Sequence, residues 1–293
     1  MKNILVTGSK GQVGQELQTL APDYPDFKFL FVDVEELDIT DGKAVQQFMQ
    51  KINLDYCINC AAYTAVDKAE SDEAMAKKVN VDGVYHLAQA CLLHQAEFFQ
   101  LSTDYVYHND WNRPLTETAP TDPKSVYART KLQGDEMAQK ILPSSVIIRT
   151  SWVYSSFGHN FVKTMRRLGS ERDSLNVVID QIGTPTYARD LAQAMLQMIS
   201  KVENDEVERS ALSGIYHFSN EGVTSWYDFA HAIFDLSNID CKLSPIPTTA
   251  YPTPATRPPF SLLDKQKIRK VFDLDIPHWR DSLKACLELL KDS

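Results

Sequence analysis

A regular alternation of short apolar runs and longer amphipathic segments over the first half of the chain constrains the fold most. The apolar runs have the length of buried strands and are Lys2–Thr7, Phe27–Asp33, Asp55–Ala61, Glu97–Thr103 and Ser145–Thr150. Helical periodicity fills most of the gaps, at Gln12–Leu20, Asp41–Lys51, Ser71–His94 and Tyr127–Lys140. Because strands that alternate with helices pair in parallel through right-handed crossovers, the pattern predicts an α/β fold with a doubly wound parallel sheet.

The rhythm loosens after Trp152, where helical patterns alternate with few strands. These patterns are Asn160–Leu168, Ala188–Lys201, Ser225–Leu236 and Trp279–Leu290. The stretch from Pro245 to Pro259 holds six prolines and cannot form a regular helix or a central strand. We therefore expect a sheet domain over residues 1–150 and a smaller α/β substrate-binding domain formed mainly by residues 151–293, with later helices able to return to the sheet.

A glycine-rich loop joins the first strand to the first helix. Gly8, Gly11 and Gly14 follow a G-x-x-G-x-x-G spacing, which suits a tight turn and the approach of a pyrophosphate to a helix N-terminus. Asp33 ends the second strand, where a carboxylate can bind the adenosine ribose. This context predicts a Rossmann-type sheet that binds NADPH or NADH. Asp33 favours NADH, whereas Lys10 can attract the 2′-phosphate of NADPH, so the preference stays open.

Tyr127 and Lys131 place a phenol and an ammonium one turn apart on a predicted helix. A second Tyr/Lys pair of the same spacing, Tyr24 and Lys28, contains a proline and lies at the opposite end of the sheet from the expected ligand crevice. Thr103 ends the fourth strand at the crevice. We expect Thr103 to hydrogen-bond a substrate carbonyl and Tyr127 to protonate it, with a phenol pKa lowered by the nearby cation. Lys131 can also hold the nicotinamide ribose.

Composition excludes several other classes of protein. A net charge of −9 without any basic run argues against nucleic-acid binding. No segment has the roughly 18 apolar residues of a membrane helix, and the apolar stretch Ile4–Val6 is too short for a signal peptide, so we expect a cytoplasmic protein. Cys57 and Cys60 form a C-x-x-C inside a strand pattern and should point to opposite faces. The histidines have no metal-binding spacing.

The chain resembles the extended short-chain dehydrogenases, and within them the dTDP-4-keto-L-rhamnose reductases, from Met1 to about Trp279. The resemblance rests on GSKGQVGQEL (8–17), NCAAYTAVDKAE (59–70), STDYVY (102–107), VYARTK (126–131), RTSWVY (149–154), DQIGTPT (180–186) and YPTPATRP (251–258). It implies the reduction of the 4-keto group of dTDP-4-dehydro-L-rhamnose to dTDP-L-rhamnose by NADPH or NADH, by a protein that is a monomer or a homodimer.

The resemblance also implies site residues. The catalytic residues are Thr103, Tyr127 and Lys131. Cofactor contacts fall on Gly8, Gly11, Gln12, Val13, Gly14, Asp33, Asp38, Ile39, Ala62, Tyr63, Thr64, Tyr127 and Lys131. Substrate contacts fall on Thr103, Asp104 and Trp152, with Arg257 as either a ligand of the diphosphate or a solvated loop arginine.

The sequence departs from the resemblance at a magnesium site that some members form through glutamates at a dimer interface. Glu16 is present, but Arg189 stands where a second glutamate is expected, so we predict no metal. Two rival functions stay open: another nucleotide-sugar epimerase or dehydratase, and a non-catalytic subunit like the β subunit of methionine adenosyltransferase. Thr103-Asp104-Tyr105 lacks the Asp-Glu pair typical of dehydratases, and the intact triad disfavours the regulatory subunit.

Overall fold

The computed structural model describes residues 1–109 and 111–291 and is built around a six-stranded, wholly parallel sheet. The strands lie in the order β10–β5–β4–β3–β1–β2. Their bounds are β1 (Lys2–Thr7), β2 (Phe27–Val32), β3 (Tyr56–Asn59), β4 (Glu97–Thr103), β5 (Val146–Thr150) and β10 (Gly214–Phe218). Because β1 lies between β2 and β3, the strand order reverses there, which is where such sheets bind ligands. The predicted α/β fold is confirmed.

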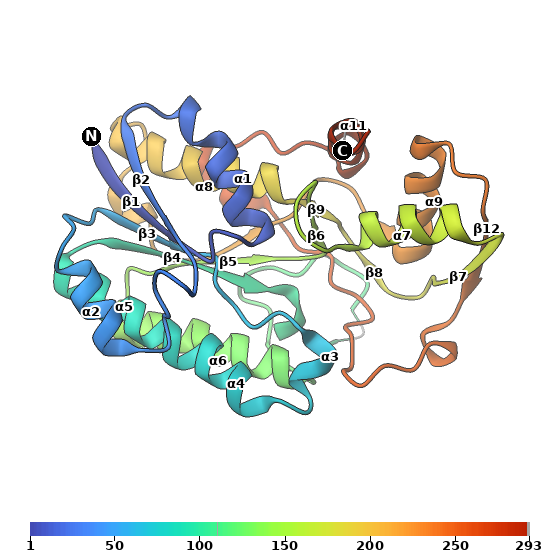
Figure 1. Cartoon of the computed structure of the whole chain (residues 1–293), viewed down its shortest axis with the longest axis horizontal. Helices are drawn as coiled ribbons and strands as arrows, with labels where there is room; N and C mark the ends of the chain where they lie inside the picture. The colour runs from blue at the N-terminus through green and yellow to red at the C-terminus, as the bar shows by residue number, and fades with distance from the viewer. Residues whose placement is uncertain (110, 292–293) are drawn as a thin grey trace.

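Helices cover both faces of this sheet (Figure 1). One face carries α1 (Gln12–Leu20), α8 (Ala188–Glu203) and α10 (Gln266–Phe272), and the other carries α2 (Gly42–Met49), α5 (Val84–His94) and α6 (Val126–Ile141). Alternate residues of each strand feed the two cores: Ile4 and Val6 pack toward α1 and α8, and Leu5 packs toward α5. Cys57 and Cys60 likewise pack against opposite faces, as predicted.

A second group of elements lies beyond the carboxyl ends of the strands, on the right of Figure 1. It comprises α7 (Phe161–Glu171), β7 (Ser174–Val178), α9 (Trp226–Ser237), β12 (Lys242–Ile246) and α11 (Trp279–Leu289), which share a core of their own. Pro245 is accommodated in β12 because this strand pairs only with β7. Two further pairs of two-residue strands are β6 (Val153–Tyr154) with β9 (Thr186–Tyr187), and β8 (Ile182–Gly183) with β11 (Thr224–Ser225).

Residues after 150 contribute to both groups of elements. Strand β10 extends the central sheet beside β5, and α8 packs against α1. A division of the chain at residue 150 into two domains stays a prediction.

The helix predicted over Ser71–His94 is more complex than the sequence indicates. After a short helix α3 (Val66–Ala69), the chain forms α4 (Glu73–Lys77), a π-helical turn at Lys78–Gly83 and then α5. The widened turn lies against α6, the helix that carries Tyr127 and Lys131. None of the helices in the described residues is long and apolar enough to cross a membrane.

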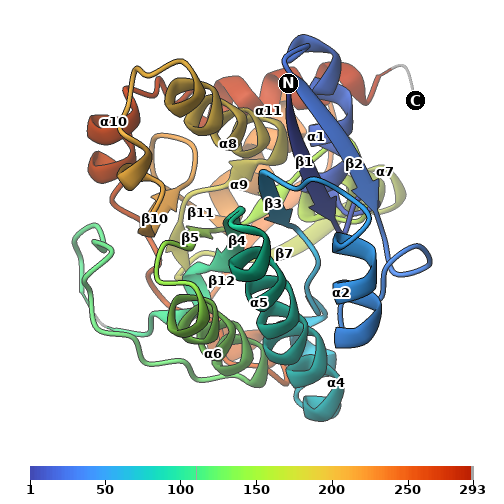
Figure 2. The same ribbon diagram turned by 90° about the vertical axis from the view of Figure 1, so that its left-hand side faces the viewer.

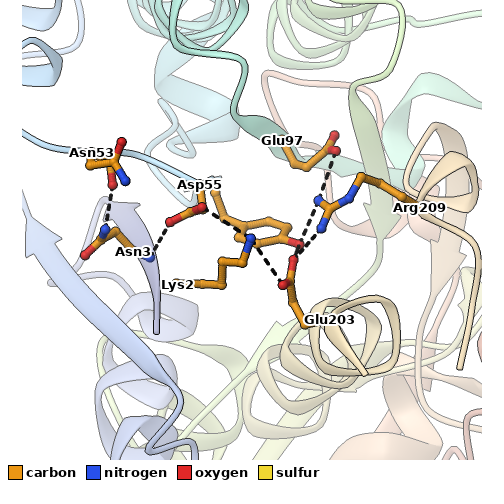
Figure 3. Close-up of polar contacts among 8 residues, drawn as sticks. Lys2, Asn3, Asn53, Asp55, Glu97, Glu203 and Arg209 are labelled. Carbon is orange, nitrogen blue, oxygen red and sulfur yellow. Dashed lines mark hydrogen bonds and ion pairs between the residues drawn. The ribbon is translucent and has the colours of Figure 1, made fainter. Parts of the chain in front are cut away.

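A cluster of charged side chains ties the amino-terminal edge of the sheet to the end of α8 (Figure 3). Glu203 forms ion pairs with Lys2 at 3.3 Å and with Arg209 at 2.6 Å, and it accepts a hydrogen bond from the phenol of Tyr56. Lys2 and Arg209 extend the cluster to Asp55 and Glu97. This edge lies opposite the ligand crevice, which is at the carboxyl ends of the strands. The cluster therefore stabilises the sheet and takes no part in the site.

Candidate active site

A cleft of about 640 Å³ opens at the carboxyl ends of the central strands. Eleven of the predicted cofactor residues line it: Gly8, Gly11, Gln12, Val13, Asp33, Asp38, Ile39, Ala62, Thr64, Tyr127 and Lys131. Two do not line it. Gly14 packs beneath the loop against Gly8 and Ser9. Tyr63 donates its hydroxyl to Asp72 at 3.0 Å.

The loop geometry explains why the turn after β1 needs glycine at position 8. Gly8 has a φ of +64°, and a Cβ there would lie 2.5 Å from the backbone nitrogen of Ala61. The turn closes with a hydrogen bond from Gly11 N to Gly8 O at 3.0 Å, and α1 begins at Gln12. The loop therefore brings the N-terminus of α1 to the cleft, where free backbone N–H groups favour a phosphate.

Asp33 lies at the end of β2 beside this loop. Its Oδ2 accepts a hydrogen bond from Lys10 N at 2.8 Å, and its Oδ1 accepts one from Val34 N at 2.8 Å. The Lys10 ammonium forms an exposed ion pair with Glu35 at 2.8 Å. The Lys10 ammonium, which can meet a 2′-phosphate, is therefore paired with Glu35 and also feels the charge of Asp33.

Asp33→Ala is expected to weaken NADH binding by about tenfold, or ~1.4 kcal/mol, and NADPH binding by less. The substitution removes a ribose acceptor for both cofactors, but for NADPH it also removes a charge that repels the phosphate. Lys10→Ala should do the reverse. Fluorescence titration of both cofactors against both variants measures the change, and equal losses for NADH and NADPH would contradict the assignment of Asp33.

A side-chain cap and two residues of β4, Leu101 and Thr103, hold the start of α6 in place. The helix begins after Ser125, whose Oγ accepts a hydrogen bond from Ala128 N at 3.2 Å. The phenol of Tyr127 is hydrogen-bonded to the Thr103 hydroxyl, and the Lys131 Nζ donates to Leu101 O at 2.6 Å. The structure thus places Thr103 beside Tyr127, and Tyr127 and Lys131 both line the cleft.

The prediction that Lys131 lowers the pKa of the Tyr127 phenol is wrong. Burial raises the pKa of Tyr127 to about 12, opposed by the Thr103 hydrogen bond. Burial also lowers the pKa of Lys131 to about 8, with the charge of Asp135 opposing that change. Sequence spacing could not reveal how deeply the pair is buried. At neutral pH the phenol is protonated, which is the form that donates a proton to a ketone.

The predicted substrate residues Asp104, Trp152 and Arg257 are not among those that line this cleft. Asp104 is buried beside Thr103 and Ser261, and burial raises its pKa to about 7. Trp152 has a φ of +48°, and Trp226 stacks on one face of its indole with 3.7 Å between the ring centroids. Arg257 is not a solvated loop arginine. Its two terminal guanidinium nitrogens donate hydrogen bonds to the two carboxylate oxygens of Asp67, at 3.0 and 2.8 Å. It also lines a second cavity, of about 580 Å³.

The sequence reasoning missed several residues that line the cleft. Some lie beside predicted positions, such as Cys60, Leu101 and Ser102. Gly158 and His159 come instead from the segment before α7 and approach the loop after β1. In that segment Asn160 Nδ2 donates to Gln12 Oε1 at 2.9 Å. No local pattern shows that a segment about 150 residues away returns to the cleft.

The residues around Glu16 do not fit a metal ion. One Glu16 oxygen accepts a hydrogen bond from the Ser155 hydroxyl at 2.6 Å, and the other lies 3.9 Å from the Arg189 guanidinium. Within residues 1–109 and 111–291, no three His, Cys, Asp or Glu side chains are grouped to hold a metal. A guanidinium beside the Glu16 carboxylate repels a divalent cation.

We therefore predict that removal of divalent metals leaves the protein unchanged. Treatment with a chelator should alter neither turnover nor the elution volume in size-exclusion chromatography. A loss of activity or a smaller species that magnesium restores would contradict this prediction and assign Glu16 as a ligand.

The parallel doubly wound sheet, the glycine-rich loop at its switch point and the Thr103–Tyr127–Lys131 group define an extended short-chain dehydrogenase/reductase. The sequence profile described as "RmlD substrate binding domain" matches residues 1–291. The chain belongs to this family, that of the dTDP-4-dehydrorhamnose reductases.

Close relatives match over almost the full length of the chain. The dTDP-4-dehydrorhamnose reductase of Aggregatibacter actinomycetemcomitans is 41% identical, with 97% of this chain and 98% of the relative aligned. The crystal structure of a dTDP-4-dehydrorhamnose reductase from Clostridium acetobutylicum has a TM-score of 0.92 and 40% identity, covering 99% of both chains. That of the Bacillus anthracis reductase in complex with NADP has a TM-score of 0.91 and 36% identity, covering 99% of this chain and 100% of that one.

Proposed function

We propose that the protein reduces the 4-keto group of dTDP-4-dehydro-L-rhamnose to give dTDP-L-rhamnose, with NADPH or NADH as the hydride donor. The observation that carries the proposal is that Tyr127 and Lys131 line the cofactor cleft and that Thr103 lies against Tyr127. The proposal also draws on the relatives, which carry this activity in their names over nearly the whole length of the chain.

A nicotinamide held in the cleft beside Tyr127 and Lys131 would supply the hydride for C4 of the sugar. The side chains stabilise the charge that develops on the ketone oxygen. Thr103 donates a hydrogen bond to the carbonyl oxygen, and the Tyr127 hydroxyl gives its proton to that oxygen as the C4 hydroxyl forms. The phenolate that remains is stabilised by the Lys131 ammonium, held by Leu101 O at 2.6 Å, and is reprotonated from solvent.

The second cavity suits the nucleotide part of the substrate. Aromatic side chains from Phe161, Trp226 and Tyr251 line it and offer flat surfaces to a base. Arg257 also lines this cavity and offers its guanidinium to the diphosphate. Trp152 stacks on Trp226, which lines this cavity, and Asp104 accepts a hydrogen bond from the Thr103 hydroxyl, so both are placed to contact the sugar. A monomer or homodimer in the cytoplasm stays a prediction.

The test is the oxidation of NADPH and NADH in the presence of dTDP-4-dehydro-L-rhamnose, with NMR identification of the sugar product. We expect stoichiometric cofactor oxidation and dTDP-L-rhamnose. An epimerase would convert the sugar without net cofactor oxidation, and a dehydratase would release water. A regulatory subunit would bind cofactor without turnover.

A further inference from the structure

Beneath the catalytic face of α6 lies a buried network of polar side chains that the mechanism above does not use. Its members are Ser102 on β4, Tyr107 just after β4, Asp135 on α6, Arg149 on β5 and His217 on β10, and none is more than 5% exposed. Strands β4, β5 and β10 are neighbours in the sheet, and α6 packs on the face of the sheet against β4 (Figure 2). A buried ion pair is costly to desolvate and contributes little to stability compared with apolar packing, so its presence beside a site calls for a functional explanation.

The hydrogen bonds of this network form a chain in which Arg149 is the first donor and the carbonyl oxygen of Leu115 is the last acceptor. The Arg149 guanidinium donates to the Tyr107 hydroxyl at 2.7 Å, and that hydroxyl lies 2.7 Å from His217 Nε2. The Nδ1 of His217 lies 3.0 Å from the carbonyl oxygen of Leu115, which can only accept. Nδ1 therefore carries the proton, and Nε2 accepts from Tyr107. Burial lowers the pKa of His217 to about 3, so the ring is neutral and Arg149 is left facing Asp135.

Asp135 connects this network to the catalytic helix. Its Oδ2 accepts hydrogen bonds from the Ser102 hydroxyl at 2.7 Å and from Arg149 Nε at 3.3 Å. It follows Lys131 by one helical turn, as Lys131 follows Tyr127. Burial raises the pKa of Asp135, and the charges of Arg149 and Lys131 oppose this rise.

Three successive residues of β4 therefore hold three successive turns of α6. Leu101 binds Lys131, Ser102 binds Asp135, and Thr103 binds Tyr127. A shift of α6 along β4 would break all three contacts together. Asp135 is also paired with Arg149, which lies on β5, the strand beside β4.

We propose that Asp135, held by Arg149, is a positioning residue of the reductase: it fixes the register of α6 on β4 and supplies the negative charge that faces the Lys131 ammonium. This inference rests on the proposed function of Tyr127 and Lys131. Besides Asp135, the group that bears on the charge of Lys131 is the Cys60 thiol at the end of β3. Asp104 and Asp135 both bear on Tyr127.

Asp135→Asn tests the charge while keeping the shape of the side chain. Without the carboxylate, Lys131 loses its proton at a lower pH, because the charge of Asp135 no longer opposes the effect of burial. We expect the alkaline limb of the profile of kcat/KM against pH to shift to lower pH by about one unit, which is a tenfold loss on that limb. Asp135→Glu, which keeps the charge, should restore most of the wild-type profile.

The matched control is Asp190→Asn, since Asp190 is also hydrogen-bonded to two side chains, Asn220 and Ser282, but lies on α8. It should lower thermal stability without moving the alkaline limb. An unmoved limb in Asp135→Asn, with only a lower Tm, would overturn the proposal. If Asp135→Asn does not fold, Ser102→Ala removes one hydrogen bond from the carboxylate and should shift the limb in the same direction by less; no shift there would also overturn it.

The pH dependence of NADPH affinity separates this inference from the proposed function. Lys131 lines the cofactor cleft, so loss of its proton should weaken NADPH binding whether or not the sugar is the right substrate. If wild type fails to reduce the sugar while NADPH affinity in Asp135→Asn still falls at a lower pH, the proposed substrate is wrong and the positioning role stands. An unchanged affinity profile counts against Asp135 itself.

Discussion

Tyr127→Phe is expected to lower turnover by roughly 10²–10⁴-fold, the usual effect of removing one general acid. The ring stays, packed edge-on against the ring of Tyr105 with 5.6 Å between the two ring centroids, so the cleft should keep its shape. Only the proton donor is lost. NADPH affinity should fall little, because the glycine-rich loop and Asp33 are untouched. Steady-state kinetics and cofactor titration on the same preparation measure both quantities.

The control is Tyr24→Phe, which alters the other Tyr/Lys pair of the same spacing. Tyr24 precedes β2 and stacks on Phe27 at a centroid distance of 5.9 Å, at the edge of the sheet away from the cleft. Its loss should leave turnover unchanged. Equal losses in the two variants would show that Tyr127 is not the proton donor.

The parts of the site that could be predicted from sequence are those set by local geometry. Each strand of the first half is a short apolar run, and in a parallel sheet all carboxyl ends meet at one edge. Gly8, Asp33 and Thr103 each end or follow such a run, so their convergence follows from the strand pattern alone. Tyr127 and Lys131 required one more step, the assignment of a helix after β4.

The parts that could not be predicted depend on contacts between distant segments. Strands β6 and β9 have two residues each, too few to show a period, and they form only because Val153 pairs with Thr186. Arg257 is 190 positions from its partner Asp67. The pKa of Tyr127 depends on its burial and on Thr103, neither of which residue spacing encodes.

The substitution Gly134→Ala is expected to damage the site from outside it. Gly134 lies on α6 where the helix crosses the π-helical turn, and a Cβ there would lie 2.1 Å from the carbonyl oxygen of Asn80. Because that atom is backbone, no side-chain rotation relieves the clash, and α6 must move. Overpacking of this kind costs about 1–3 kcal/mol, which for a chain of this size lowers Tm by several degrees.

The movement of α6 should also reduce catalysis, through both ends of the contact. Tyr127 and Lys131 move with the helix. Asn80 connects α6 to the residues around Tyr63, next to cleft residues Ala62 and Thr64. Its Oδ1 accepts a hydrogen bond from Tyr63 N at 2.8 Å, and its Nδ2 donates to the Thr130 hydroxyl of α6 at 3.1 Å. A displacement of about 1 Å between reacting groups lowers kcat by roughly 10²-fold.

Gly42→Ala is the control for the added methyl group. A Cβ on Gly42, in the first turn of α2, would meet the ring of His86 at 2.8 Å, which is a side chain held by one hydrogen bond to Ile39 O and not backbone. It should keep most of its activity, with a smaller fall in Tm. Differential scanning fluorimetry and kcat with saturating NADPH compare the two variants. Wild-type Tm and kcat in Gly134→Ala would mean that α6 does not depend on its close approach to Asn80, and that the register of the catalytic helix is set by its contacts with β4 alone.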